Sequence, residues 1–120
     1  MGDWKDNEPI YLQLRDLVMT QILGGMIAEG EAVPSVRQVA SEERINPLTV
    51  SKAYQLLVDD GLLEKRRGLG MFVADGAQAA ALEQERKRFL SEEWPETLAR
   101  IDALQLNPQE LPGLTTGERS

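Results

Sequence analysis

Residues 34 to 73 carry, without a gap, the signals of two short helices in succession. The first is expected to begin after Ser35, whose hydroxyl can cap free backbone N–H groups while Gln38, three residues later, bonds back to it. The second is expected to begin after Asn46, because the proline that follows lacks an N–H that the first turn would leave unpaired. Gly61 favours the left-handed conformation that ends a helix. The stretch therefore predicts two helices joined by a tight turn.

A β-hairpin is expected directly after these helices. The runs 62–65 and 71–74 are β-prone, and between them lies a basic tip, 66–70, that contains two glycines. Helix, helix and hairpin in this order are typical of a winged helix-turn-helix, which reads DNA. The predicted fold class is α+β and mostly helical: a winged helix-turn-helix DNA-binding domain followed by short C-terminal helices.

An amphipathic helix is expected before this motif, from Pro9 to the pair Gly24-Gly25. Its apolar stripe comprises Ile10, Leu14, Leu17, Val18, Ile22, Leu23 and Met26. Residues 32–34 are expected to add a short strand beside the hairpin. In the second helix of the motif, helical spacing buries Val50, Ala53, Tyr54 and Leu57 and turns Leu48, Thr49, Ser51, Lys52 and Gln55 outward.

The C-terminal third returns to helical period over residues 77–105. Pro95 is expected to break or kink this segment, because it has no N–H and clashes with the preceding turn. Residues 107–110 are expected to cap one more short helix. The chain thus divides into a winged domain at 8–75, a C-terminal helical dimerisation region at 77–111 and a disordered tail at 112–120.

Composition narrows the function classes. A chain of 120 residues has room for one compact domain and a helical appendage. With no cysteine and no histidine it lacks disulfides, zinc fingers, Cys/His catalysis and the usual transition-metal sites, so we expect no enzyme, no metal and no cofactor. No apolar run is long enough to span a bilayer and the first residues lack the pattern of a signal peptide, so a cytoplasmic protein without membrane contact is expected.

The net charge of −7 argues against nucleic acid until its distribution is considered. Residues 1–32 hold two basic and six acidic side chains, residues 33–73 hold six and five, and residues 74–120 hold five and nine. Only the third that contains the winged-helix pattern is positive. Its cations at helix starts and on the hairpin are Arg37, Lys52, Lys65, Arg66 and Arg67. We therefore expect DNA binding through a local patch, with high salt sensitivity.

The same residues carry a resemblance to a known family. The segments that carry it are Pro9-Ile10-Tyr11, Pro34-Ser35-Val36-Arg37-Gln38, Asn46-Pro47, Thr49-Val50-Ser51-Lys52-Ala53-Tyr54, Gly61-Leu62-Leu63 and Arg67-Gly68-Leu69-Gly70-Met71-Phe72-Val73. Over about residues 9–75 the chain resembles the DNA-binding domain of the GntR family of bacterial transcription regulators. The motif Asn-Pro-x-Thr-Val-x-x-Ala-Tyr and the short C-terminal tail are most similar to those of the YtrA subfamily. The resemblance implies a dimer formed through the C-terminal helices, which represses its own operon and transporter genes.

The chain departs from the family in two places. Pro47 and Leu48 stand where arginine and a polar residue are common, and Leu48 is expected to alter base specificity by contacting a thymine methyl group. Glu43 and Arg44 replace apolar and glycine residues in the turn between the helices, so the resemblance alone does not fix that turn.

The candidate contacts to double-stranded operator DNA lie at helix starts and at the hairpin tip. They are Ser35, Arg37, Asn46, Leu48, Thr49, Ser51, Lys52, Arg66, Arg67, Gly68 and Gly70. Ordinary solvated helix surface or a solubilising turn would look the same locally, and the basic run 86–88 is read in that way because glutamates surround it.

The apolar face of the tail has no partner domain in this chain, which favours a second copy and hence a two-fold operator. The expected homodimer interface comprises Leu82, Phe89, Trp94, Leu98 and Ile101. Alternatively, some of these residues pack on the first helix of the same chain. A small-molecule effector of unknown identity remains open, as do activation in place of repression, a winged helix that binds protein, and a fragment of a larger regulator.

Overall fold

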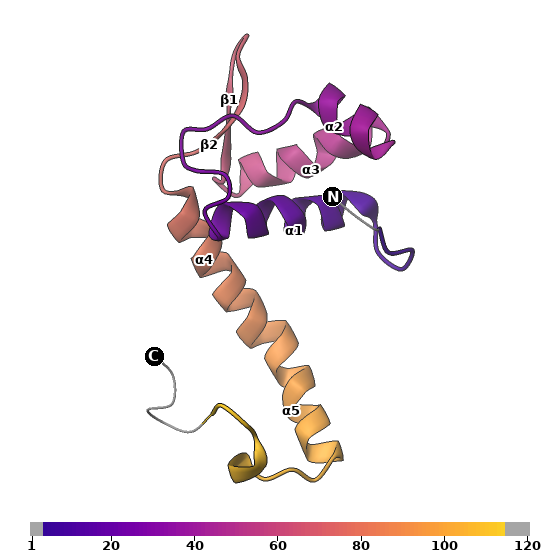
Figure 1. Cartoon of the computed structure of the whole chain (residues 1–120), viewed down its shortest axis with the longest axis vertical. Helices are drawn as coiled ribbons and strands as arrows, with labels where there is room; N and C mark the ends of the chain where they lie inside the picture. Colours follow the sequence, from indigo (N-terminus) through magenta and orange to yellow (C-terminus); the bar gives the residue numbers. More distant parts are fainter. Residues whose placement is uncertain (1–3, 115–120) are drawn as a thin grey trace. The chain divides into compact units, whose positions relative to one another are not determined.

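The computed structural model describes residues 4–114. Its elements in chain order are α1 (Ile10–Leu23), α2 (Val36–Glu43), α3 (Pro47–Asp59), β1 (Leu63–Arg66), β2 (Gly70–Val73), α4 (Ala77–Arg88), the π-helical turn η1 (Phe89–Glu93), α5 (Trp94–Ala103) and the 3₁₀ turn η2 (Pro108–Glu110) (Figure 1). The chain divides into two compact units, one ending at Glu83 and the other beginning at Gln84. Each unit is described by itself.

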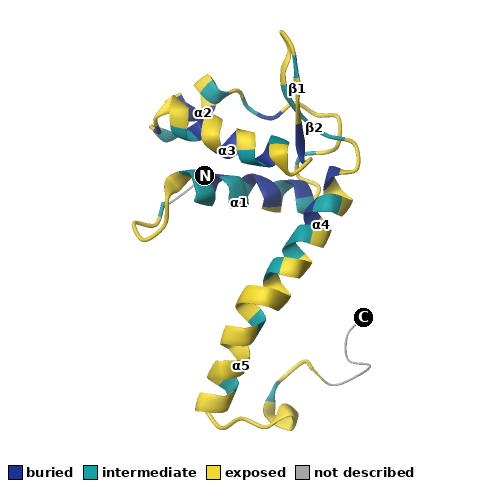
Figure 2. Ribbon diagram, turned by 180° about the vertical axis from the view of Figure 1, so that it is seen from behind, coloured by how far each residue is buried: buried dark blue, intermediate teal, exposed yellow. Residues whose placement is uncertain are grey.

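The first unit is a winged helix-turn-helix whose core lies between α1, α3 and the hairpin (Figure 2). The buried face of α3 predicted from its spacing is confirmed, with Val50, Ala53, Tyr54 and Leu57 all at most 1% exposed. Burial of a side chain such as that of Val50 or Leu57 contributes roughly 1.5–3 kcal/mol to the free energy of unfolding. This packing fixes which face of α3 is left to meet a partner.

The predicted helix boundaries rest on local caps, and most of them are confirmed. Ser35 Oγ accepts a hydrogen bond from the Gln38 backbone N–H at 3.0 Å, and Asn46 Oδ1 accepts one from the Leu48 N–H at 2.8 Å. The Gln38 side chain donates to Glu42 Oε2 at 3.3 Å, so the reciprocal bond back to Ser35 that the sequence predicted is replaced by a contact along the helix. Both helices of the motif therefore begin where their capping residues place them.

The turn between α2 and α3 is held by a residue in an unusual conformation. Arg44 is left-handed, with φ 56° and ψ 48°, and the next N–H, of Ile45, donates to the Ala40 carbonyl at 3.1 Å. This is the hydrogen-bonding pattern of a helix ending that glycine normally occupies. The chain thus keeps a tight turn although it lacks the glycine.

The hairpin pairs Leu63 with Val73 and Arg66 with Gly70 in an antiparallel register. Each strand lies one residue nearer the tip than predicted, because the Leu69 N–H donates to the Arg66 carbonyl at 2.9 Å and closes a short turn. Of the short strand expected at 32–34, the structure shows a single bridge, between Ala32 and Phe72. The loop before α2 is thereby fixed beside the hairpin.

Two details of α1 and α4 differ from the sequence-based expectation. Met26, assigned to the apolar stripe of α1, is 77% exposed, because the helix ends at Leu23 and the chain no longer follows the helical period. At the other end of the unit, Ala77 and Ala81 of α4 are fully buried in the core. The boundary between the two units consequently falls inside α4, later than residue 76.

The start of α4 is fixed by Glu29 from the loop after α1. Its carboxylate accepts hydrogen bonds from the backbone N–H groups of Gly76 at 2.9 Å and Gln78 at 3.1 Å, and the Gln78 side chain donates to the Leu23 carbonyl at 3.0 Å. These donors hold the pKa of Glu29 below its ordinary value.

In the second unit the helix does not break at Pro95. The backbone widens into the π turn η1, in which the Trp94 N–H donates to the Phe89 carbonyl, and α5 follows at once. A wide turn accommodates the proline ring that would clash in a regular α-helix. The rings of Phe89 and Trp94 stack, with centroids 6.4 Å apart. The segment was predicted to break or kink at Pro95: the helical path is not broken, but the regular α-helix is interrupted by the π turn just before the proline.

A short helical turn was predicted after Asn107 and is confirmed as η2, where the Glu110 side chain accepts a hydrogen bond from the Asn107 N–H at 2.7 Å. The disordered tail expected at 112–120 falls largely on residues 115–120, which lie outside the described residues. Between residues 4 and 114, no helix combines the length and the apolar character needed to cross a membrane.

Candidate nucleic-acid interface

A groove of about 430 Å³ lies between the start of α2, the outer side of α3 and the hairpin. It brings together residues from all three elements, among them Ser35, Ser51, Gln55, Lys65, Arg66, Gly68 and Gly70. Five of these seven were predicted as DNA contacts, and sequence reasoning left out Lys65 and Gln55. Lys65 belongs to the basic run at the hairpin and Gln55 was placed on the outward face of α3, so both signals were present in the sequence.

Tyr54 fixes the relative position of α2 and α3. It is 1% exposed, and its hydroxyl donates to the Pro34 carbonyl at 2.7 Å. Burial raises the pKa of Tyr54 to about 12, so the phenol stays neutral and keeps donating this bond. Pro34, directly before the residue that caps α2, is thus tied to the buried face of α3.

The outward face of α3 carries a large apolar side chain at its N-terminal end. Leu48 is 77% exposed at the first turn, with Ser51 and Lys52 exposed beside it, whereas Thr49 is half-buried. Asn46 caps the helix through the Leu48 N–H, so its side chain is already used within the fold. An exposed leucine flanked by a hydroxyl and an ammonium offers both apolar and polar contacts to base edges.

The cations of the hairpin occupy different environments. Arg66 is half-buried: its Nε donates to Glu64 Oε2 at 2.9 Å and its guanidinium lies 4.2 Å from the centre of the Phe72 ring. Lys65 and Arg67 are exposed. Arg66 is therefore held within the hairpin, and Arg67 is the cation that the tip presents to solvent.

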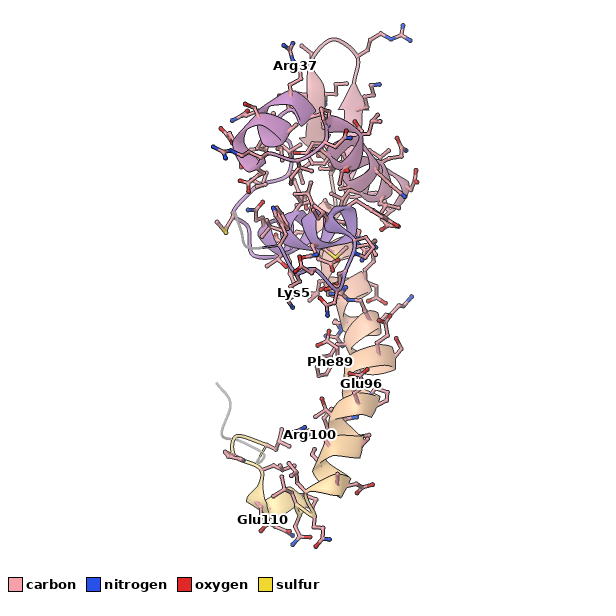
Figure 3. All side chains as sticks on the ribbon, turned by 90° about the vertical axis from the view of Figure 1, so that its right-hand side faces the viewer. Lys5, Arg37, Phe89, Glu96, Arg100 and Glu110 are labelled. Carbon is pink, nitrogen blue, oxygen red and sulfur yellow. The ribbon has the colours of Figure 1, made fainter. Side chains whose placement is uncertain are left out.

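The hairpin tip places its backbone within reach of a partner. Gly68 and Gly70 have φ values of 76° and 113°, which side chains rarely adopt, and neither would place a Cβ within 4 Å of another part of the fold. Leu69 between them is 71% exposed and was not among the predicted contacts. Arg37 extends from the start of α2 on the same side of the domain as the hairpin (Figure 3).

The candidate dimer residues lie in two places. Leu82 belongs to the first unit, and the remaining four belong to the second. Leu82, Phe89 and Leu98 are exposed, and Trp94 and Ile101 are half-buried. None of residues 84–114 is buried, so the apolar side chains of this unit stand largely open to solvent. Within the described residues, no three acidic side chains gather into a possible metal site.

Comparison with known proteins gives a consistent result. The family model "Bacterial regulatory proteins, gntR family" matches residues 10–73. The chain is 36% identical over 81 residues to the HTH-type transcriptional repressor YtrA of Bacillus subtilis, a match that covers 68% of this chain and 62% of that protein. The chain spans less than two thirds of the length of the curated relatives it matches.

Two solved structures resemble the fold. A transcriptional regulator from Oenococcus oeni superposes with a TM-score of 0.74 at 27% identity, covering 92% of this chain and 89% of that one. The DNA-binding domain of AraR in complex with operator ORR3 superposes with a TM-score of 0.55 at 28% identity, covering 62% of this chain and 88% of that one.

Proposed function

This chain belongs to the GntR family of bacterial regulatory proteins, and we propose that it is a sequence-specific transcription regulator that binds operator DNA through its winged helix-turn-helix. The observation that carries the proposal is the groove between α3 and the hairpin, which gathers hydroxyls, cations and open glycine backbone from three elements. The similar AraR domain was crystallised with operator DNA, which supports the same mode here.

The α3 helix enters the major groove with Leu48, Ser51 and Lys52 foremost. Leu48 meets a thymine methyl group, and the polar pair meets base edges or neighbouring phosphates. The half-buried Thr49 contacts the DNA beside these residues, at the edge of the outward face of α3. This surface determines which operator sequence is preferred.

The start of α2 and the hairpin tip hold the backbone of the DNA. Ser35 and Arg37 take one phosphate, since helix N-terminal N–H groups and a guanidinium converge there. Arg67, with the glycines on either side of Leu69, approaches phosphates or the minor groove. These contacts set affinity and register, and they carry little sequence information.

The open apolar face of the C-terminal unit forms a homodimer, and the dimer binds an operator with two-fold symmetry. As a regulator similar to YtrA, which is described as a repressor, the protein represses its own operon and transporter genes. It acts in the cytoplasm, where bacterial DNA lies.

The test is selection of duplexes from random DNA by the intact chain, repeated with the Thr49→Ala/Ser51→Ala double variant. We expect the wild-type chain to return a two-fold consensus and the variant to return an altered one, with random DNA held about equally. An unchanged consensus would remove α3 from base readout.

A second candidate function is suggested by the acidity of the chain, which has a net charge of −7. A winged helix that binds a protein partner would show no duplex binding even at low salt, and substitution of the hairpin cations would leave its function intact. Titration of labelled duplex at low ionic strength separates the two.

A further inference from the structure

Lys52 of α3 does not extend freely into solvent. Its Nζ lies 4.0 Å from the centre of the Tyr11 ring, in the first turn of α1. Tyr11 is half-buried and packs against the core, so its ring is a fixed surface. The contact joins an exposed cation of the recognition helix to an element outside the helix-turn-helix.

The outward face of α3 therefore has two different edges. Ser51 lies on the edge that borders the hairpin groove, and Lys52 lies on the opposite edge, beside α1. Each edge therefore has different neighbours. On one edge, Ser51 lines the groove beside the hairpin, and on the other, Lys52 lies over the Tyr11 ring.

We propose that Tyr11 is a positioning residue for DNA recognition, whose ring holds the Lys52 ammonium where a phosphate oxygen beside α3 will lie. The proposal rests on the DNA-binding function proposed above. A lysine over an aromatic ring is attracted by the ring quadrupole but still has N–H donors directed away from the ring. Lys52 is exposed, so these donors are accessible to a phosphate.

The benefit is entropic. A lysine side chain that is free in solution loses rotamer freedom when it is immobilised on DNA, and that loss reduces affinity. The Tyr11 ring restricts Lys52 before DNA arrives, so less freedom is lost on binding. For one such side chain the effect on the dissociation constant is about three- to tenfold.

The experiment uses full-length variants and a labelled duplex that carries the consensus selected by the intact chain. Lys52→Met keeps the apolar stem but removes the charge, Tyr11→Leu removes the ring, and Tyr11→Phe is the matched control that keeps it. We expect Lys52→Met to weaken binding and to reduce the log–log salt slope by about one. Tyr11→Leu should weaken binding about three- to tenfold, and Tyr11→Phe should bind as the wild type does.

The double variant Tyr11→Leu/Lys52→Met distinguishes positioning from packing. If Tyr11 acts through Lys52, the double variant binds no more weakly than Lys52→Met alone. In the DNA-free protein, the Lys52 ε-methylene protons should be shifted upfield by the ring in the wild type and in Tyr11→Phe, and should return to the free-lysine position in Tyr11→Leu.

Additive losses in the double variant would overturn the inference, as would equal losses for Tyr11→Phe and Tyr11→Leu or an unshifted Lys52 signal in the wild type. In these cases DNA binding itself would stand. A wild-type chain that selects no duplex would instead overturn the proposed function together with this inference.

Discussion

Replacement of Arg44 by glycine should stabilise the protein, although it deletes a side chain from the turn between α2 and α3. Arg44 is exposed and has φ 56° and ψ 48°. An L-residue in this left-handed conformation costs roughly 1–2 kcal/mol, which glycine avoids. Glycine also makes the unfolded chain more flexible, which costs about 0.4–1 kcal/mol. The difference predicts a rise of about 0.5–1 kcal/mol in the free energy of unfolding for Arg44→Gly.

The measurement is urea denaturation followed by far-ultraviolet circular dichroism, supported by thermal unfolding. For a folded unit of this size the gain corresponds to an increase in Tm of roughly 2–8 °C. Arg44→Ala is the matched control, because it removes the same side chain but keeps the Cβ that causes the strain. Arg44→Asn should fall between the two, since asparagine tolerates the left-handed region better than alanine.

The reasoning is refuted if Arg44→Gly is no more stable than Arg44→Ala. Such a result would mean that the turn does not require a left-handed residue at this position. A gain shared equally by the glycine and alanine variants would assign the effect to the arginine side chain and not to the backbone.

Further predictions concern DNA binding, assembly and acid stability. Arg37→Ala and Arg67→Ala should each weaken binding to all duplexes and reduce the log–log salt slope by about one unit, and unchanged slopes with an intact fold would remove these residues from the interface. Phe89→Ala and Leu98→Ala should each weaken dimer association by more than ~2 kcal/mol and reduce operator binding. Sedimentation velocity should then show a shift from dimer to monomer. A dimer that persists in both variants would place the interface elsewhere. The pKa of Glu29 is depressed from 4.5 by its backbone donors, so its stabilisation is fully present above about pH 4.5 and is lost as the pH falls through the lower folded value. Glu29→Gln should therefore flatten this acid limb of the stability profile, measured by urea midpoints at a series of pH values, and an identical limb in the variant would show that Glu29 does not contribute to it.

The helix-turn-helix could be predicted from the sequence because its determinants are local. The caps at Ser35 and Asn46 act on N–H groups two or three residues away, and Gly61 has a φ of 78° at the end of α3. The buried face of α3 follows from spacing within one helix. These signals reach no further than one or two turns, and the sequence displays them in full.

The candidate interface could be predicted only in outline. Cations and glycines on the hairpin could be predicted from the sequence. The sequence did not show that Arg66 contacts Glu64 and the Phe72 ring, whereas Arg67 is exposed. The Phe72 contact follows from strand pairing, in which Glu64 lies opposite Phe72, and from β1 reaching Arg66, one residue nearer the tip than predicted.

What the tertiary structure alone decided are the contacts between residues far apart along the chain. Glu29 caps α4 across 47 residues, and Ala77 and Ala81 are buried although alanine gives no marked apolar periodicity. Lys52 meets Tyr11 only because α1 packs on α3. Sequence periodicity specifies which face of a helix is apolar. Which element covers that face depends on packing of the whole core, because the hydrophobic effect has no direction. The long-range hydrogen bonds that fix the arrangement form only after the elements have packed together.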